Sequence, residues 1–263
     1  MRLIYLTLIF LVTNSFPLEN IFARKLIDGP TTGLLSKAYY DLNFRFFFGG
    51  GLTTSVDLGV GNNINLGIGW GIDHLINQGK VDFFIPGVAL KYRALQESYQ
   101  LPSIALGFDN RPLSSYTSYQ NRHYFKSKGL FLVISKNYLF LGSQLGMHAG
   151  VNYSVVDNRL ETYGYTSNDG ANDFPNLYFG FDKVILGNFS IMMEYDCAMD
   201  DNLSHNPFEG YLHAAARYFF LNAILIELDF KDLFQNKKIY WGRNNYNRGR
   251  FSRELQISHI RHF

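Results

Sequence analysis

Apolar and polar residues alternate with a period of two along most of the chain. The first clear run places Ala38, Tyr40 and Phe44 on one face and Asp41 and Arg45 on the other. This alternation is typical of strands that have one apolar face. The sixth run is apolar on both faces, which leaves its orientation open. The sequence predicts about twelve strands, an even number, at 38–46, 52–60, 64–72, 88–93, 104–109, 129–135, 145–153, 177–182, 189–196, 212–218, 224–231 and 254–263.

The predicted connections alternate between tight turns and long links. Asn62-Asn63, Lys136-Asn137, 186–188 and Leu221-Asn222 carry residues that suit tight turns, and segment 95–101 is looser. Outer-membrane barrels have short periplasmic turns and long external loops, so a periplasmic N-terminus puts these turns on one side. Only the glycines at 49–51 make a short link where a long one is expected. The longer links lie near 73–86, 110–128, 154–175, 199–209 and 233–251.

Alternation alone does not distinguish a membrane barrel from a soluble β-sandwich, which buries its apolar face. Here the polar face is rich in glycine, as at Gly67, Gly146 and Gly180, and this suits a crowded barrel interior. Aromatic residues such as Trp70 and Tyr153 stand near strand ends, as in the aromatic girdles of membrane barrels. The expected fold class is therefore all-β, a closed antiparallel transmembrane barrel located in the cell outer membrane, with the soluble secreted sandwich as the alternative.

The first residues have the pattern of a secretory signal peptide. Arg2 is followed by an apolar run from Leu3 to Val12, which is too short to span a bilayer as a helix. Cleavage is expected after small residues near 13–15 or at Ala23. The predicted organisation is a signal peptide and short leader over 1–23, followed by a single barrel domain over 24–263.

Composition narrows the possible functions. The formal net charge is +2, so no strong field points to nucleic acid, and Cys197 is the single cysteine, so no disulfide forms within the chain. The glycines between Gly59 and Gly71 lack the spacing of a phosphate-binding loop. The histidines show no convergent ligand spacing. No metal and no cofactor are expected.

Charged residues on the polar face of the predicted strands are candidates for the barrel lumen. If they pair across the lumen, they favour a plugged structural barrel, whereas small lining residues favour a channel. The lumen candidates are Asp57, Lys91, His148, Asp182, Glu194, Asp196, His213, Arg217, Glu227, Asp229 and Lys231.

The link 233–253 is basic and aromatic, with no acidic residue between Asp232 and Glu254. Such a loop binds anionic sugars or phosphates through charge and stacking. Contact with outer-membrane lipid and lipopolysaccharide, or plain solvation, is the simpler interpretation. The loop candidates are Lys237, Lys238, Tyr240, Trp241, Arg243, Tyr246, Arg248 and Arg250.

Short motifs resemble those of the YjbH-like exopolysaccharide-associated outer-membrane proteins. They are Leu26-Ile27-Asp28-Gly29-Pro30-Thr31-Thr32 before the first strand, Ala105 to Asp109, and Gly129 to Lys136. The chain departs from that pattern after Phe108. The resemblance implies an outer-membrane barrel linked to polysaccharide export or the cell surface, and it carries over no catalytic residue. The terminal Phe263 resembles the aromatic end that the barrel assembly machinery reads.

The residues therefore favour a non-enzymatic barrel, either a narrow channel or a surface accessory of polysaccharide secretion. The second hypothesis is a hydrolase of lipid or lipopolysaccharide, which needs a Ser/His or Asp/His constellation at the outer rim. His148 with Ser135 or Ser143 is conceivable, but nothing in the sequence selects either pair.

Overall fold

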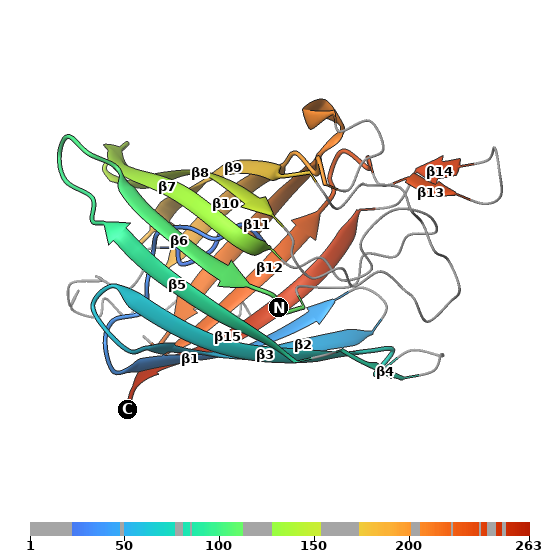
Figure 1. Cartoon of the computed structure of the whole chain (residues 1–263), viewed down its shortest axis with the longest axis horizontal. Helices are drawn as coiled ribbons and strands as arrows, with labels where there is room; N and C mark the ends of the chain where they lie inside the picture. The colour runs from blue at the N-terminus through green and yellow to red at the C-terminus, as the bar shows by residue number, and fades with distance from the viewer. Residues whose placement is uncertain are drawn as a thin grey trace, which may run out of the picture.

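Twelve antiparallel strands form a closed barrel in the computed structural model (Figure 1). The structure describes residues 23–47, 50–76, 81–84, 86–112, 128–153, 174–200, 206–221, 223–236, 238–240, 246–248 and 251–263. Residues 1–22 of the predicted signal peptide and leader lie outside them. The barrel strands are β1 (Tyr39–Phe47), β2 (Gly51–Gly59), β3 (Ile64–Asp73), β5 (Gly87–Leu95), β6 (Ser103–Asp109), β7 (Gly129–Phe140), β8 (Ser143–Tyr153), β9 (Asn176–Leu186), β10 (Phe189–Asp196), β11 (Tyr211–Phe220), β12 (Ile224–Lys231) and β15 (Ser252–His262).

Neighbours in sequence pair with one another, and the last strand closes the ring. β15 pairs with β12 on one side and with β1 on the other, where Tyr39 faces His262 and Phe46 faces Leu255. A closed ring satisfies the backbone groups of every barrel strand, which is the condition for a sheet to cross lipid. Among the described residues, no helix is long and apolar enough to cross a membrane.

Three short strands lie outside the ring. β4 (Asp82–Phe83) pairs with the end of β3, and β13 (Lys238–Tyr240) pairs with β14 (Tyr246–Arg248) as a hairpin beyond the barrel. A short 3-10 helix, η2 (Pro207–Glu209), lies between β10 and β11 at the same end, and its cap Asn206 accepts a hydrogen bond from the backbone of Phe208. These elements belong to the long links (Figure 1).

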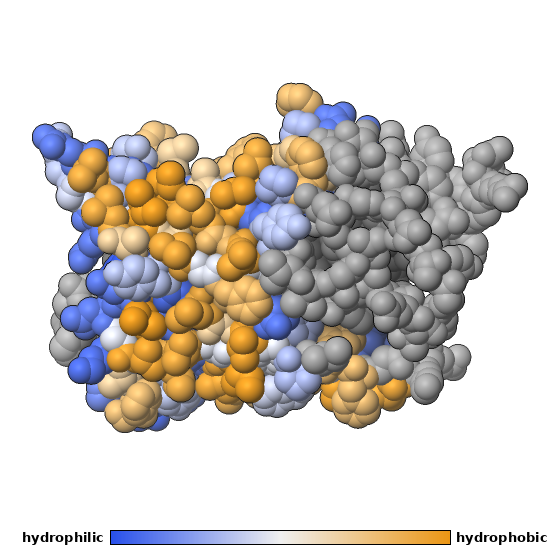
Figure 2. Space-filling view, viewed as in Figure 1, coloured by the Kyte–Doolittle hydropathy of each residue, from blue (hydrophilic) through white to orange (hydrophobic). Residues whose placement is uncertain are grey.

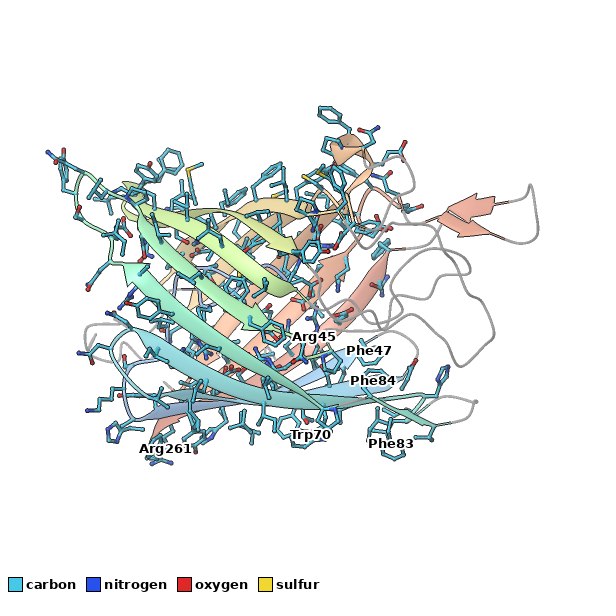
Figure 3. The ribbon with its side chains drawn as sticks, viewed as in Figure 1. Arg45, Phe47, Trp70, Phe83, Phe84 and Arg261 are labelled. Atoms are coloured by element: carbon cyan, nitrogen blue, oxygen red, sulfur yellow. The ribbon has the colours of Figure 1, made fainter. Side chains whose placement is uncertain are left out.

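The barrel wall is apolar outside and polar inside. Leu66, Ile68 and Trp70 of β3 are each more than 40% exposed, whereas Asn65, on the other face of the same strand, is buried. Figure 2 shows apolar side chains gathered over the strands, and Figure 3 shows Trp70 and Phe83 pointing away from the barrel. A soluble sandwich buries its apolar face, so the soluble alternative is wrong for this chain.

The sixth predicted run has a definite orientation in the structure. Leu130, Leu132 and Ile134 of β7 point outward, while Phe131 and Val133 are buried in the barrel. Both faces are apolar because the inner one packs against Ala105 of β6. The sequence could not decide this, since either face would suit lipid.

The tight turn predicted at Lys136-Asn137 is wrong. β7 continues to Phe140, and the turn lies at Leu141 and Gly142, whose φ angles are +49° and +73°. Asn137 stays in the strand because its side chain donates to Glu97 in the neighbouring turn. Polarity there reflects contacts at the barrel rim rather than the end of a strand.

Residues 23–35, called the plug from here on, lie inside the barrel rather than beside it (Figure 1, blue). Followed backwards from the start of β1, the chain passes Ala38, whose amide donates to the carbonyl oxygen of Gly59 at the tight-turn end of the barrel. It then runs into the lumen and doubles back, with a turn in which Leu26 N donates to Gly29 O at 2.8 Å. Both arms of this hairpin therefore enter from the same end.

Candidate functional site in the barrel lumen

The tip of the plug is held by one carboxylate of the barrel wall. Glu194 of β10 accepts hydrogen bonds from the backbone amides of Ile27, Asp28 and Gly29, at 2.9, 2.8 and 3.0 Å. Its side chain is fully buried. Three consecutive amides that point at one anion form a concave site for negative charge, and such charge-assisted bonds are about twice as strong as neutral ones.

The carboxylate of Asp28 bridges two cations of the opposite wall. Its Oδ1 lies 2.7 Å from Arg45 Nη2, and its Oδ2 lies 2.6 Å from Lys231 Nζ. Burial alone would raise the pKa of Asp28, but Lys231 and Arg45 outweigh burial and hold that pKa well below its ordinary value. Asp28 is therefore ionised while the plug is docked.

Glycines allow the plug tip to pack closely against β9. The ring of Tyr178 lies over Gly29, where an added Cβ would be only 2.5 Å from a ring carbon, and the Tyr178 hydroxyl donates to Pro30 O at 2.9 Å. On the wall, a Cβ at Gly180 would lie 2.7 Å from Leu26 Cδ1. The inward glycines thus make room for a segment of chain.

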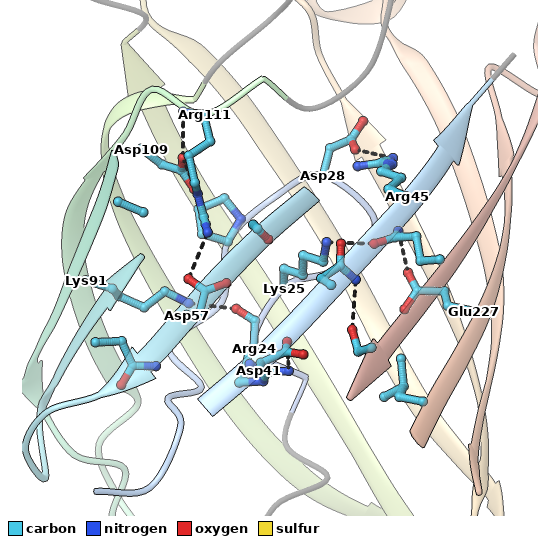
Figure 4. Close-up of a pocket in the computed structure, with 18 of the residues that line it drawn as sticks. Arg24, Lys25, Asp28, Asp41, Arg45, Asp57, Lys91, Asp109, Arg111 and Glu227 are labelled. Carbon is cyan, nitrogen blue, oxygen red and sulfur yellow. Dashed lines mark hydrogen bonds and ion pairs between the residues drawn. The ribbon is translucent and has the colours of Figure 1, made fainter. Parts of the chain in front are cut away.

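The arms of the hairpin are bound to the other side of the lumen (Figure 4). Arg24 Nη2 lies 2.5 Å from Asp41 Oδ2 of β1. Lys25 Nζ donates to Gln256 Oε1 of β15 at 2.8 Å, and burial lowers the pKa of Lys25. Lys91 of β5 donates to the carbonyl oxygens of Arg24 and Gly33. The plug therefore contacts strands all around the ring.

A chain of hydrogen bonds joins Ser135, His148 and Asp182 on neighbouring strands. Ser135 Oγ is 2.8 Å from His148 Nδ1, and His148 Nε2 is 2.8 Å from Asp182 Oδ1. The hydroxyl of Ser135 also accepts from the backbone amide of Thr32 at 3.2 Å. These three residues lie near the middle of their strands and face the lumen, where Ser135 contacts Thr32 of the plug. They therefore do not form the outer-rim constellation that a lipid hydrolase requires.

Most of the remaining wall charges are paired inside the barrel. Arg111 holds both Asp57 and Asp109, at 2.8 and 2.7 Å, and the pKa of Arg111 lies well above its ordinary value. Burial alone would lower that pKa, and the two carboxylates more than offset this effect. Other pairs include Lys128 with Asp196, Arg217 with Glu227, Gln256 with Asp229, and His213 Nδ1, which accepts from Asp232 N.

Two spaces remain beside the plug. A cavity of about 140 Å³ lies between the plug and the strands that carry Asp57, Lys91 and Gln256. A wider vestibule of about 730 Å³ is lined by the plug arms and by Arg93, Glu97, Ser135 and His148. Within the described part of the chain, no group of three or more potential ligands is arranged to hold a metal ion.

Every sequence-predicted lumen residue lies on the inner face of the barrel, and the plug brings Lys91, Glu194 and Lys231 together around it. Sequence reasoning missed Asp28, Arg45 and Gln256 as site residues. The Leu26 to Thr32 motif was the available signal, but a position before the first strand does not show that a segment lies inside the barrel. Of the loop candidates, the structure describes only the backbone of 238–240 and 246–248, and the rest lie outside the described residues.

A closed barrel with an apolar exterior and a charged, plugged lumen defines a transmembrane β-barrel of the outer-membrane type. No family model matches the chain, and no curated protein matches it. Similar solved structures include the NanC porin, with 12% identity over 85% of this chain and 99% of that chain and a TM-score of 0.42. The KdgM porin has 9% identity over 86% of this chain and 99% of that chain, with a TM-score of 0.45. An outer membrane channel from Pseudomonas putida F1 is also similar, with 9% identity over 87% of this chain and 97% of that chain and a TM-score of 0.39.

Proposed function

We propose that this protein is a non-enzymatic outer-membrane channel that is closed by its own N-terminal plug and opens when the plug leaves the lumen. The observation that carries the proposal is the way Glu194 holds the plug tip through backbone amides. Because water can replace these hydrogen bonds when the plug leaves, this mode of attachment suits reversible docking.

The apolar contacts of the plug support the same conclusion. Ile27 packs with Met192 and Ala215 as a small buried cluster, and Leu26 meets Gly180. Burying one such side chain contributes about 1.5–3 kcal/mol, and at the plug tip two aliphatic side chains, Leu26 and Ile27, are buried in this way. A plug held mainly by polar contacts is suited to release rather than to permanent filling of a core.

A link to polysaccharide export is the finer proposal, and the resemblance to the YjbH-like proteins supports it. The resemblance includes Leu26 to Thr32, which is the tip and one arm of the plug. We infer that the shared motif serves plug docking, so the barrel would act as a gated accessory of secretion at the cell surface. Loss of secreted polysaccharide on deletion of residues 24–35 would support this finer role.

A disulfide between the plug and the wall tests the channel. The Thr32 amide lies 3.2 Å from Ser135 Oγ, so these two positions are adjacent and are chosen for a pair of cysteines. The variant T32C/S135C is made with C197S, which removes the native thiol. We expect no conductance in a planar bilayer when the pair is oxidised and clear channel openings after reduction.

The matched control carries T32C and C197S alone and should be insensitive to oxidant. Equal conductance of the oxidised and reduced double variant would show that the plug is not the gate. No conductance in either state, from a barrel whose mobility still shifts on boiling, would contradict the channel itself.

A further inference from the structure

We propose, on the basis of the proposed channel function, that the open lumen prefers cations and that the solutes it admits carry ammonium or guanidinium groups. The plug occupies the place of such a solute. At Glu194 and Asp41 its contacts with the wall are those that a chain of cationic and N–H donor groups would make.

The wall itself has more buried acids than buried bases. In the described barrel strands, the buried basic side chains of the inner face are Arg45, Arg217 and Lys231. The partly exposed inward groups Asp57, Asp109, Lys91 and Arg111 balance one another in charge, and Arg111 pairs with both carboxylates. Lys128, directly before β7, is a further buried base and pairs with Asp196. The buried acidic side chains of the inner face are Asp41, Asp73, Asp182, Glu194, Asp196, Glu227, Asp229 and Glu254.

The plug neutralises acids that have no other ion-pair partner. Arg24 pairs with Asp41, and the amides of residues 27–29 satisfy Glu194. Within the described part of the chain, neither Asp41 nor Glu194 forms an ion pair with a cation of the barrel wall. Removal of the plug therefore leaves two carboxylates facing the lumen.

The two wall cations that pair with Asp28 of the plug keep an acid when it leaves. Arg45 Nε lies 2.5 Å from Glu254 Oε2, and Lys231 Nζ lies 3.6 Å from Glu254 Oε1. Loss of Asp28 thus leaves these two cations partly compensated by the wall. When the plug leaves, carboxylates of the wall become exposed to the lumen. Their negative charge raises the local concentration of cations in a narrow pore.

The geometry at Glu194 narrows the class of solute. One carboxylate there accepts three N–H donors. A primary ammonium offers three donors and a guanidinium five, each with a positive charge. Such groups can replace the plug amides bond for bond, whereas an anionic solute would face Glu194 and Asp41 without a donor.

The test is the reversal potential of the refolded barrel lacking residues 24–35, in a planar bilayer with a KCl gradient. We expect K⁺ to be several-fold more permeant than Cl⁻. The changes E194Q and D41N in this background should each move the permeability ratio toward one. The control E209Q removes a carboxylate from η2, outside the lumen, and should leave the ratio unchanged.

Each outcome separates the two proposals. A closed barrel that conducts Cl⁻ better than K⁺ overturns the cation preference and leaves the channel intact. A closed barrel that does not conduct at all contradicts the channel. If the shortened chain fails to form a heat-modifiable barrel, the same reversal potentials are measured on openings of full-length D28N, where the ion pairs of the plug tip are weakened but the wall is unchanged.

Discussion

Asp28 and Arg45 form an ion pair inside the barrel, with Asp28 Oδ1 2.7 Å from Arg45 Nη2. Both side chains are almost completely buried, although one belongs to the plug and the other to the first strand of the wall. The pair is joined by Lys231 from the far end of the sequence. It connects the plug to the two strands next to the closing strand β15, so plug docking and barrel closure reinforce each other.

Weakening this pair should open the channel. In D28N the amide keeps the shape of the side chain but not its charge, and removal of one partner of a buried ion pair costs about 3–5 kcal/mol. Because about 1.4 kcal/mol is tenfold, the open fraction should rise at least roughly a hundredfold. Single-channel recording gives this fraction directly. The control D109N weakens a pair between Asp109 and Arg111 that does not involve the plug, and it should not increase opening.

A steric change at the plug tip should open the channel without altering any charge. In G29A the new methyl would lie 2.5 Å from a ring carbon of Tyr178, which forces the tip to shift. Such overpacking costs about 1–3 kcal/mol. We expect more frequent openings and faster proteolysis of residues 24–35. G187A is the matched control, because a Cβ there has nothing within 4 Å. Equal protease resistance of both variants would contradict the docked position of Gly29.

The pH dependence follows from the lowered pKa of Asp28. The docked carboxyl binds protons less readily than the released one, whose ordinary pKa is 3.8. Docking is therefore fully stabilised by this group above pH 3.8 and loses that stabilisation as the pH falls through the depressed pKa. We expect the contribution of Asp28 to closure to be constant between pH 7 and 5 and to decline only below 3.8. The comparison of wild type with D28N isolates it, and a difference between them that declines near neutral pH would contradict this origin.

The Ser135–His148–Asp182 chain should matter for stability and not for hydrolysis. H148A leaves Ser135 and Asp182 without their shared partner, and an unsatisfied buried polar group costs about 1–3 kcal/mol. Urea unfolding of the detergent-solubilised barrel measures this loss. H259A is the control, since among the described residues the His259 side chain is hydrogen-bonded to the Tyr40 hydroxyl alone, at 3.2 Å near the barrel end. A lipid-hydrolysing activity that S135A abolished would instead restore the hydrolase hypothesis.

The alternation of apolar and polar residues determined the strands, their approximate number and the inner or outer face of most side chains. The sequence reaches this far because a strand has a period of two, and lipid demands an apolar exterior on every strand. The same pattern identified Asp57, Glu194 and Lys231 as lumen residues. It failed at Asn137, which is polar because of a contact with Glu97 at the barrel rim, and it could not orient β7, where both faces are apolar.

Only the tertiary structure showed that the lumen is occupied, and by which segment. Leu26 to Thr32 has no strand period, and its partners Arg45, Tyr178, Glu194 and Lys231 are spread along the chain. Those residues meet at one place only because the ring closes between β1 and β15. Local pattern carries information about the period of a strand. The pairing of a plug with its lumen depends instead on contacts between residues up to 231 positions apart, which no local pattern records.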